Sequence, residues 1–114
     1  MSASKPILRT KILDQPVRIY RRYTREVRRR GATLGHVKIW GRDRSGERKW
    51  IVDLSPDLQD GSLEELITVI HELMHVADWG RDEIHIDRSS EDIARTLWRL
   101  GYRKSSQDAT DGGH

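Results

Sequence analysis

Apolar residues recur at three- and four-residue spacing between Leu63 and Trp79, and this stretch is the clearest helical pattern in the chain. Its apolar stripe consists of Leu63, Leu66, Ile67, Ile70, Met74 and Ala77. Ser62 is a suitable N-cap, Glu65 stands three residues further on as in a capping box, and Gly80 is a natural C-terminal stop. The pattern predicts an amphipathic helix with one buried face.

Shorter apolar stretches precede this helix and are typical of strands. We expect four of them, at Ile7–Lys11, Val17–Tyr20, Leu34–Trp40 and Trp50–Leu54. Asp14-Gln15-Pro16 is a turn sequence between the first two, and Arg42–Arg48 contains the glycines of a hairpin loop between the last two.

A second helix is expected after Gly80, ending at Gly101. Its start is open between Asp82 and the Ser89-Ser90 pair. Arg21–Arg30 carries six arginines with two apolar residues, and we interpret it as a helix or an extended basic segment. The whole pattern predicts an α+β fold, in which a small antiparallel sheet packs on the first helix and on a C-terminal helix. Residues 1–104 form one domain, and the polar tail 105–114 is expected to be disordered.

The net charge of +3 conceals a strong asymmetry along the chain. Residues 1–50 contain 15 Lys and Arg against 4 Asp and Glu, whereas residues 51–114 contain 6 against 14. The sequence has no Cys, which excludes disulfides, thiolate metal sites and a cysteine nucleophile. We see no secretory signal in residues 1–6 and no apolar run of membrane-spanning length, so we expect a cytoplasmic protein.

The helix between Leu63 and Trp79 contains the motif His71-Glu72-Leu73-Met74-His75, which is H-E-x-x-H. Residues four apart share a helix face, so His71 and His75 are placed to hold one metal ion. Glu72 is the expected general base for a water at that metal. Catalytic zinc normally takes three protein ligands, so a third ligand must come from another part of the chain.

Residues 50–104 resemble the minimal core of the zincin metallopeptidases, and more closely short, gluzincin-like bacterial and phage proteins. The resemblance rests on the H-E-x-x-H run through Trp79 and on the later stretch from Asp92 to Tyr102. It implies a zinc-dependent peptidase whose third ligand is a glutamate after the motif. Glu83 is the first choice, Glu91 is the second, and His85 would make the site similar to SprT-like enzymes.

Two further expectations concern the surroundings of the metal. The metzincin pattern is excluded, because the Gly and His positions that it requires are Asp78 and Arg81 here. Asp78 is a candidate carboxylate partner for a histidine ring N–H, or else an exposed residue near the helix end. By resemblance to zincins, the strand Trp50–Leu54 is expected to bind an extended peptide substrate at a free sheet edge.

Two alternative functions remain open from the sequence. The basic segment Arg18–Arg30 and the loop 42–49 would suit nucleic-acid phosphates, with Tyr20, Tyr23, Trp40 and Trp50 available for base stacking, or they form a solvated surface. The chain would instead be a catalytically silent zincin if its metal were structural or absent.

Overall fold

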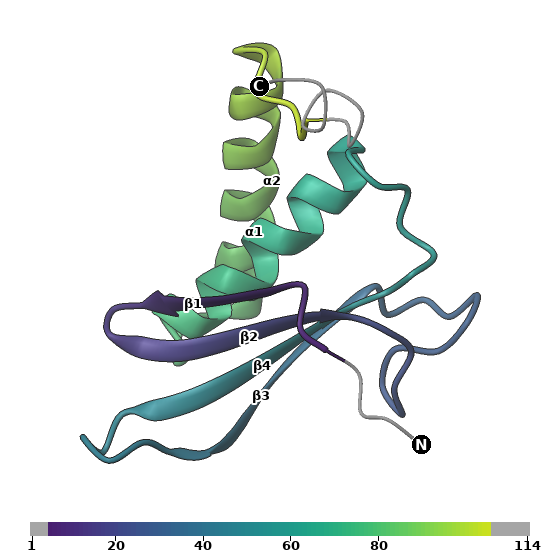
Figure 1. The fold of residues 1–114 in the computed structure, drawn as a ribbon. Helices are drawn as coiled ribbons and strands as arrows, with labels where there is room; N and C mark the ends of the chain where they lie inside the picture. The colour runs from purple at the N-terminus through teal and green to yellow at the C-terminus, as the bar shows by residue number, and fades with distance from the viewer. Residues whose placement is uncertain (1–4, 106–114) are drawn as a thin grey trace, which may run out of the picture.

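The computed structural model describes residues 5–105, in which four strands are followed by two helices. The strands are β1 (Leu8–Ile12), β2 (Gln15–Arg21), β3 (Gly35–Arg42) and β4 (Arg48–Leu54), and the helices are α1 (Leu63–Ala77) and α2 (Glu83–Arg99). They form the expected α+β fold, with both helices on the same side of one sheet (Figure 1). Apart from its first residue, the predicted tail lies outside the described residues.

The strand order in the sheet is β1-β2-β4-β3, so β1 and β3 are the edge strands. Two antiparallel hairpins, β1–β2 and β3–β4, are joined by a parallel pairing of β2 with β4. The prediction of a wholly antiparallel sheet was therefore wrong at this pair. The connection 22–34 carries the chain past one strand position, and β4 then returns into the space between β2 and β3, which makes it parallel to β2.

The segments around β2 differ from their predictions. The turn before β2 consists of Leu13 and Asp14, both at positive φ, so that Gln15 and Pro16 already belong to the strand. Arg21 ends β2, and residues 22–34 are irregular rather than helical. The Thr24 hydroxyl accepts the N–H groups of Glu26 and Val27, a local turn that competes with helix formation.

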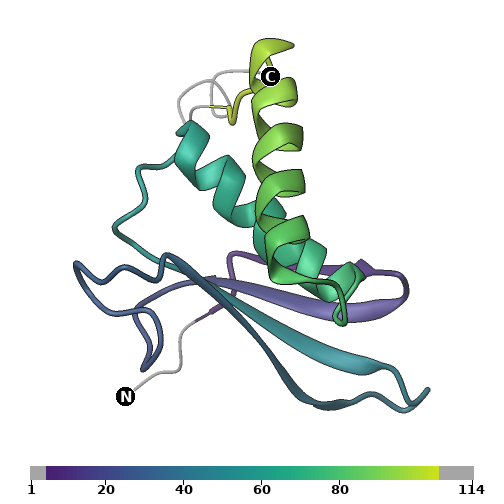
Figure 2. The same ribbon diagram turned by 180° about the vertical axis from the view of Figure 1, so that it is seen from behind.

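The core lies between the sheet and α1. Its buried apolar residues are Val17, Ile19, Trp50, Val52, Leu54, Leu58 and Val76. The second helix packs on α1 rather than on the sheet, so the prediction of a sheet packed on both helices was wrong (Figure 2). Ile86, Ser90 and Ala94 form the buried face of α2, and the two small residues permit a close approach to α1.

The start of α1 is fixed by Ser62 and Glu65, the two residues of the predicted capping box. The Ser62 hydroxyl accepts the N–H of Glu65 at 3.1 Å, and Glu65 reaches back to the N–H of Gly61 at 2.9 Å. The Arg21 guanidinium, at the end of β2, pairs with the Glu65 carboxylate and donates to the Leu58 carbonyl. These contacts tie the N-terminal end of α1 to the sheet. No helix within residues 5–105 is long and apolar enough to cross a membrane.

Candidate metal centre

The two motif histidines project from the same face of α1. Their Nε2 atoms lie 3.1 Å apart, as the four-residue spacing on a helix predicts. Both side chains are mostly buried, with 20% of His71 and 14% of His75 exposed. The helical context that the motif requires for metal binding is therefore present.

Glu83 brings a carboxylate to both histidines. Its Oε1 lies 3.2 Å from His71 Nε2, and its Oε2 lies 3.1 Å from His75 Nε2. Glu83 is the first residue of α2, which begins beside Asp82, one of the two starts left open by the sequence. The Asp82 carboxylate caps the helix by accepting the N–H groups of Ile84 and His85.

The other two candidate ligands point elsewhere. Glu91 lies two turns further along α2, where its carboxylate pairs with Arg95 at 3.1 Å. His85 is exposed and belongs to none of the ligand groupings found among the described residues. Of the three acidic and histidine candidates, Glu83 is the one that the structure brings to His71 and His75.

The donor set fits a zinc ion. Two imidazole nitrogens and one carboxylate are common ligands of catalytic zinc, which binds them at about 2.0–2.2 Å. Tetrahedral geometry at such lengths separates ligand atoms by about 3.3 Å, close to the 3.1–3.2 Å observed here. The two Nε2 atoms and the Glu83 carboxylate lie within 3.2 Å of one another, so a divalent cation could bind them together.

Asp87 holds the far side of the His71 ring. Its Oδ1 lies 3.1 Å from His71 Nδ1, one turn of α2 beyond Glu83. A carboxylate at this position accepts the Nδ1–H and leaves the Nε2 lone pair free for a metal. Asp78, the partner suggested by the sequence, instead caps the end of α1 and pairs with Arg81 at 2.7 Å. Asp87, and not Asp78, is therefore the carboxylate that lies within hydrogen-bond distance of His71 Nδ1.

Glu72 is buried beside the histidines, with 6% of the residue exposed. It packs below Gly35, the first residue of β3. A Cβ atom at Gly35 would lie 2.8 Å from Glu72 Oε2 and 2.9 Å from its Cγ, closer than real Cβ contacts allow. Glycine at position 35 therefore lets the sheet approach the glutamate, whereas the predicted strand Leu34–Trp40 gave no reason for a glycine there.

Burial raises the pKa of Glu72 from its ordinary value of 4.5 to about 7, with further contributions from the negative charges of Glu83 and Asp87. A carboxylate with a pKa near neutrality is well suited to take up and release a proton. The positive charge of a bound metal would oppose this rise, because it favours the ionised carboxylate.

A cleft of about 240 Å³ opens over these residues. Its lining comes from β3, α1 and the start of α2, namely Gly35, His36, Val37, His71, Glu72, His75, Trp79 and Glu83. The Trp79 ring packs 5.2 Å from the ring of Trp50 and 6.3 Å from that of His75. The cleft is therefore lined by the two motif histidines and two glutamates, by the aromatic ring of Trp79, and by the first residues of β3.

The strand beside the cleft is β3, which corrects the expectation for Trp50–Leu54. Those residues belong to β4, which is hydrogen-bonded to β2 on one side and to β3 on the other. It has no free edge with which to bind a peptide. In contrast, β3 is an edge strand of the sheet and contributes its first three residues to the cleft.

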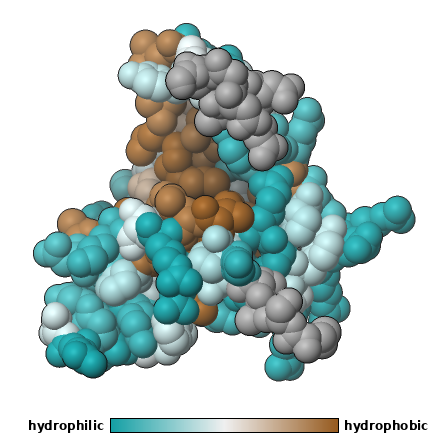
Figure 3. All heavy atoms as spheres, viewed as in Figure 1, coloured by the Kyte–Doolittle hydropathy of each residue, from teal (hydrophilic) through white to brown (hydrophobic). Residues whose placement is uncertain are grey.

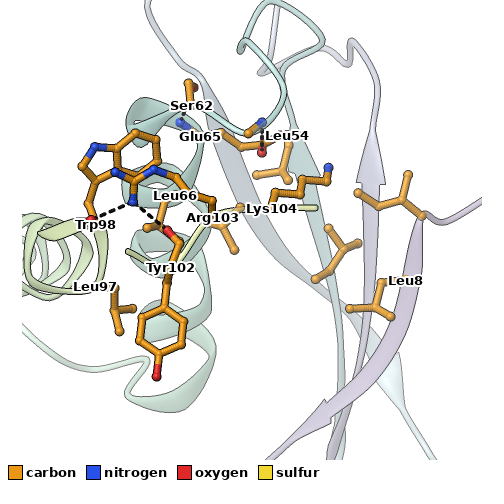
Figure 4. Close-up of a pocket in the computed structure, with 14 residues that line it drawn as sticks. Leu8, Leu54, Ser62, Glu65, Leu66, Leu97, Trp98, Tyr102, Arg103 and Lys104 are labelled. Atoms are coloured by element: carbon orange, nitrogen blue, oxygen red, sulfur yellow. Dashed lines mark hydrogen bonds between the residues drawn. The ribbon is translucent and has the colours of Figure 1, made fainter. Parts of the chain in front are cut away.

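A larger cavity, of about 570 Å³, lies away from the histidines. Apolar side chains gather there between the two helices and β1 (Figure 3). Its walls include Leu8, Leu54, Leu66, Leu97, Trp98 and Tyr102 (Figure 4). Glu65 is the one carboxylate among the lining residues, and its oxygens are taken by Arg21 and Gly61. None of the described residues that line this cavity is a histidine, and its one carboxylate is already paired, so it is not a candidate metal site.

Comparison of the chain with protein-family models, with curated proteins and with solved structures finds no match.

The contact between Gly35 and Glu72 leads to a stability prediction. We expect Gly35→Ala to lower the free energy of unfolding by about 1–3 kcal/mol, because the added methyl group must displace a buried side chain. Chemical denaturation measures this change. Gly80→Ala is the matched control, since a Cβ at Gly80 meets nothing within 4 Å. Equal stability of the two variants would contradict the close packing at position 35.

The raised pKa of Glu72 predicts a pH dependence in protein stripped of metal by a chelator. The folded state retains its proton up to about pH 7, whereas the unfolded state releases it near 4.5. Stability from this group is thus fully present below pH 4.5 and is lost as the pH rises through 7, by at most about 3 kcal/mol. Chemical denaturation across this pH range should show that the free energy of unfolding falls less steeply with pH in Glu72→Gln than in wild type. The same fall in Glu72→Gln as in wild type would exclude Glu72 as its source, and Glu64→Gln is the exposed control.

Proposed function

We propose that the protein is a zinc-dependent peptidase that hydrolyses peptide bonds with Glu72 as general base. The convergence of His71, His75 and Glu83 within 3.2 Å, next to a buried glutamate, carries this proposal. In the proposal His71, His75 and Glu83 hold the zinc. When bound, the zinc supplies Lewis acidity, which polarises a carbonyl group and lowers the pKa of water.

Glu72 and Asp87 then have defined tasks. Glu72 accepts a proton from the water that attacks the carbonyl carbon, and it delivers that proton to the leaving amine as the C–N bond breaks. Asp87 keeps His71 Nδ1 protonated and the ring correctly oriented. The burial of Glu72 limits access of bulk water to the proton that it carries.

The proposed substrate is an extended peptide lying along β3. An edge strand has unpaired N–H and C=O groups, and a peptide can add to them as a further strand. Gly35, His36 and Val37 lie both on this strand and in the wall of the cleft. A peptide paired with the start of β3 would therefore pass close to His71, Glu72 and His75.

A catalytically silent relative of such enzymes would hold the metal without needing Glu72. The burial of Glu72 beside the converging histidines places an acid–base group next to the proposed metal, which favours a working base over a purely structural site. A structural zinc site is also usually closed by four protein ligands, whereas three converge here.

Metal content and hydrolysis together test the proposal. We expect about one zinc per chain in wild type, loss of zinc in Glu83→Ala, and full zinc in Glu91→Ala, the matched control from the same helix. Glu72→Gln should keep its zinc but hydrolyse fluorescein-labelled casein at least about 100-fold more slowly. Zinc retained in Glu83→Ala would reject the ligand assignment, and undiminished hydrolysis by Glu72→Gln would reject the general base. Zinc binding without any hydrolysis by wild type would support the silent form.

The contact between Asp87 and His71 predicts a weaker metal site when the carboxylate is lost. We expect Asp87→Asn to reduce zinc affinity about 10- to 100-fold, because the amide no longer fixes the ring and its tautomer as strongly. Competition with a chromophoric chelator measures this affinity. Asp92→Asn, an exposed change on α2, should leave the affinity as in wild type, and an equal loss in both variants would point to a general charge effect.

A further inference from the structure

The sheet face opposite the helices is basic. The buried residues Val17, Ile19, Trp50, Val52 and Leu54 point toward α1, so the residues between them on β2 and β4 point to the other side. Residues of β1 and β3 that are paired with these outward-pointing residues lie on the same outer face. The cations that point outward are Arg9, Lys11, Arg18, Lys38 and Lys49.

Three of these cations form one row across the sheet. Arg9 is paired with Arg18, Arg18 with Ile51, and Ile51 with Lys38, so the row crosses all four strands. At the usual spacing between strands the row is about 14 Å long. Like charges paired directly across strands are unfavourable on their own, as Arg9 and Arg18 are here. An anionic partner would relieve this repulsion.

Near the start of β3, Glu26 lies 3.9 Å from His36, but the strands themselves contribute no exposed acidic residue to this face. Among the strand residues Asp53 is the only acid, and it is fully buried and pairs with Arg22 at 2.7 Å. Asp14, Asp43 and Glu47 lie in the turns at the ends of the strands. The outer face therefore carries three exposed cations, Arg9, Lys11 and Lys38, and two partly buried ones, Arg18 and Lys49, without an exposed carboxylate on the strands themselves.

An exposed tryptophan lies among the cations. Trp40 occupies the bulge between Ile39 and Gly41 and is 39% exposed. The Arg18 guanidinium lies 4.5 Å from its ring centroid and the Lys49 ammonium lies 3.8 Å from it. Cations beside an aromatic ring on an open surface are the groups that track the phosphates and stack the bases of single-stranded nucleic acid.

We propose that the outer face of the sheet binds single-stranded nucleic acid, with the row Arg9–Arg18–Lys38 on the phosphates and Trp40 stacking on a base. The proposed interface is the sheet face itself, and not the whole basic run that the sequence suggested. Within that run, Arg21 and Arg22 are used in internal ion pairs with Glu65 and Asp53. Trp40 can stack on a base only where that base is unpaired, which favours a single strand over a duplex.

The location is tested with two charge-matched variants of the full chain. One removes exposed cations of the outer face (Arg9→Ala, Lys11→Ala and Lys38→Ala), and the other removes three exposed cations of α2 (Arg88→Ala, Arg95→Ala and Arg99→Ala). Fluorescence anisotropy of a labelled single-stranded oligodeoxythymidine is measured over a series of salt concentrations, after circular dichroism has shown that each variant is folded.

We expect the first variant to bind at least about tenfold more weakly and to lower the magnitude of the slope of log K against log salt by about 1.4, which is about 0.7 for each of the two row cations that it removes. The α2 variant should bind as wild type does. If both variants bound equally weakly, the loss of affinity would follow from the lower net charge alone, and the proposed interface would be overturned.

The stacking role is tested separately with Trp40→Ala. This variant should bind the oligonucleotide about tenfold more weakly with an unchanged salt slope, because a base contact and not a phosphate contact is lost. Trp79→Ala is the control, since Trp79 lies on the helix side of the sheet, in the cleft. Unchanged binding by Trp40→Ala, together with tighter binding of the matched duplex than of the single strand, would overturn the single-stranded mode.

Discussion

The close approach of α1 to the start of β3 is the constraint on which the site depends. At Gly35 the backbone of the sheet comes so near to the helix that the Glu72 side chain occupies the space of a missing Cβ atom. The approach is supported by the core between Val76 and the inward residues of β4, and by the Arg21 contacts at the start of α1. It buries Glu72, raises its pKa, and turns the two histidines toward the second helix.

The second helix completes the site through local chemistry rather than through the core. Asp82 fixes the first turn of α2, and the two following acidic positions on one face, Glu83 and Asp87, meet different nitrogens of the same histidine. Because α2 packs on α1 and not on the sheet, its register relative to the histidines is set by the buried positions Ile86, Ser90 and Ala94. A one-residue slip would rotate Glu83 and Asp87 away together.

The local sequence patterns predicted the features that depend on local interactions, namely the helices, the cap of α1 and the residues that share a helix face. The helix at Leu63, its Ser62 cap and the shared face of His71 and His75 followed from spacing alone. The resemblance to gluzincin-like proteins made Glu83 the first choice for the third ligand. Asp87 stands four residues after Glu83, so the helical spacing alone places the two carboxylates on one face of α2. The parallel β2–β4 pair, the edge position of β3 and the need for glycine at 35 depend on contacts between distant segments, which periodicity does not encode.

The basic and acidic halves of the sequence lie largely on different sides of the fold. The basic half of the chain forms most of the sheet and its outer face, whereas the acidic half supplies both helices and the carboxylates around the histidines. β3 belongs to both sides, since Gly35 and Val37 face the helix side while Lys38 points away from it. Under the two proposals, a strand of nucleic acid on the outer face and a peptide at the edge of β3 would be separated by about the thickness of one sheet. Such an arrangement would bring a peptidase to substrates that are themselves bound to nucleic acid.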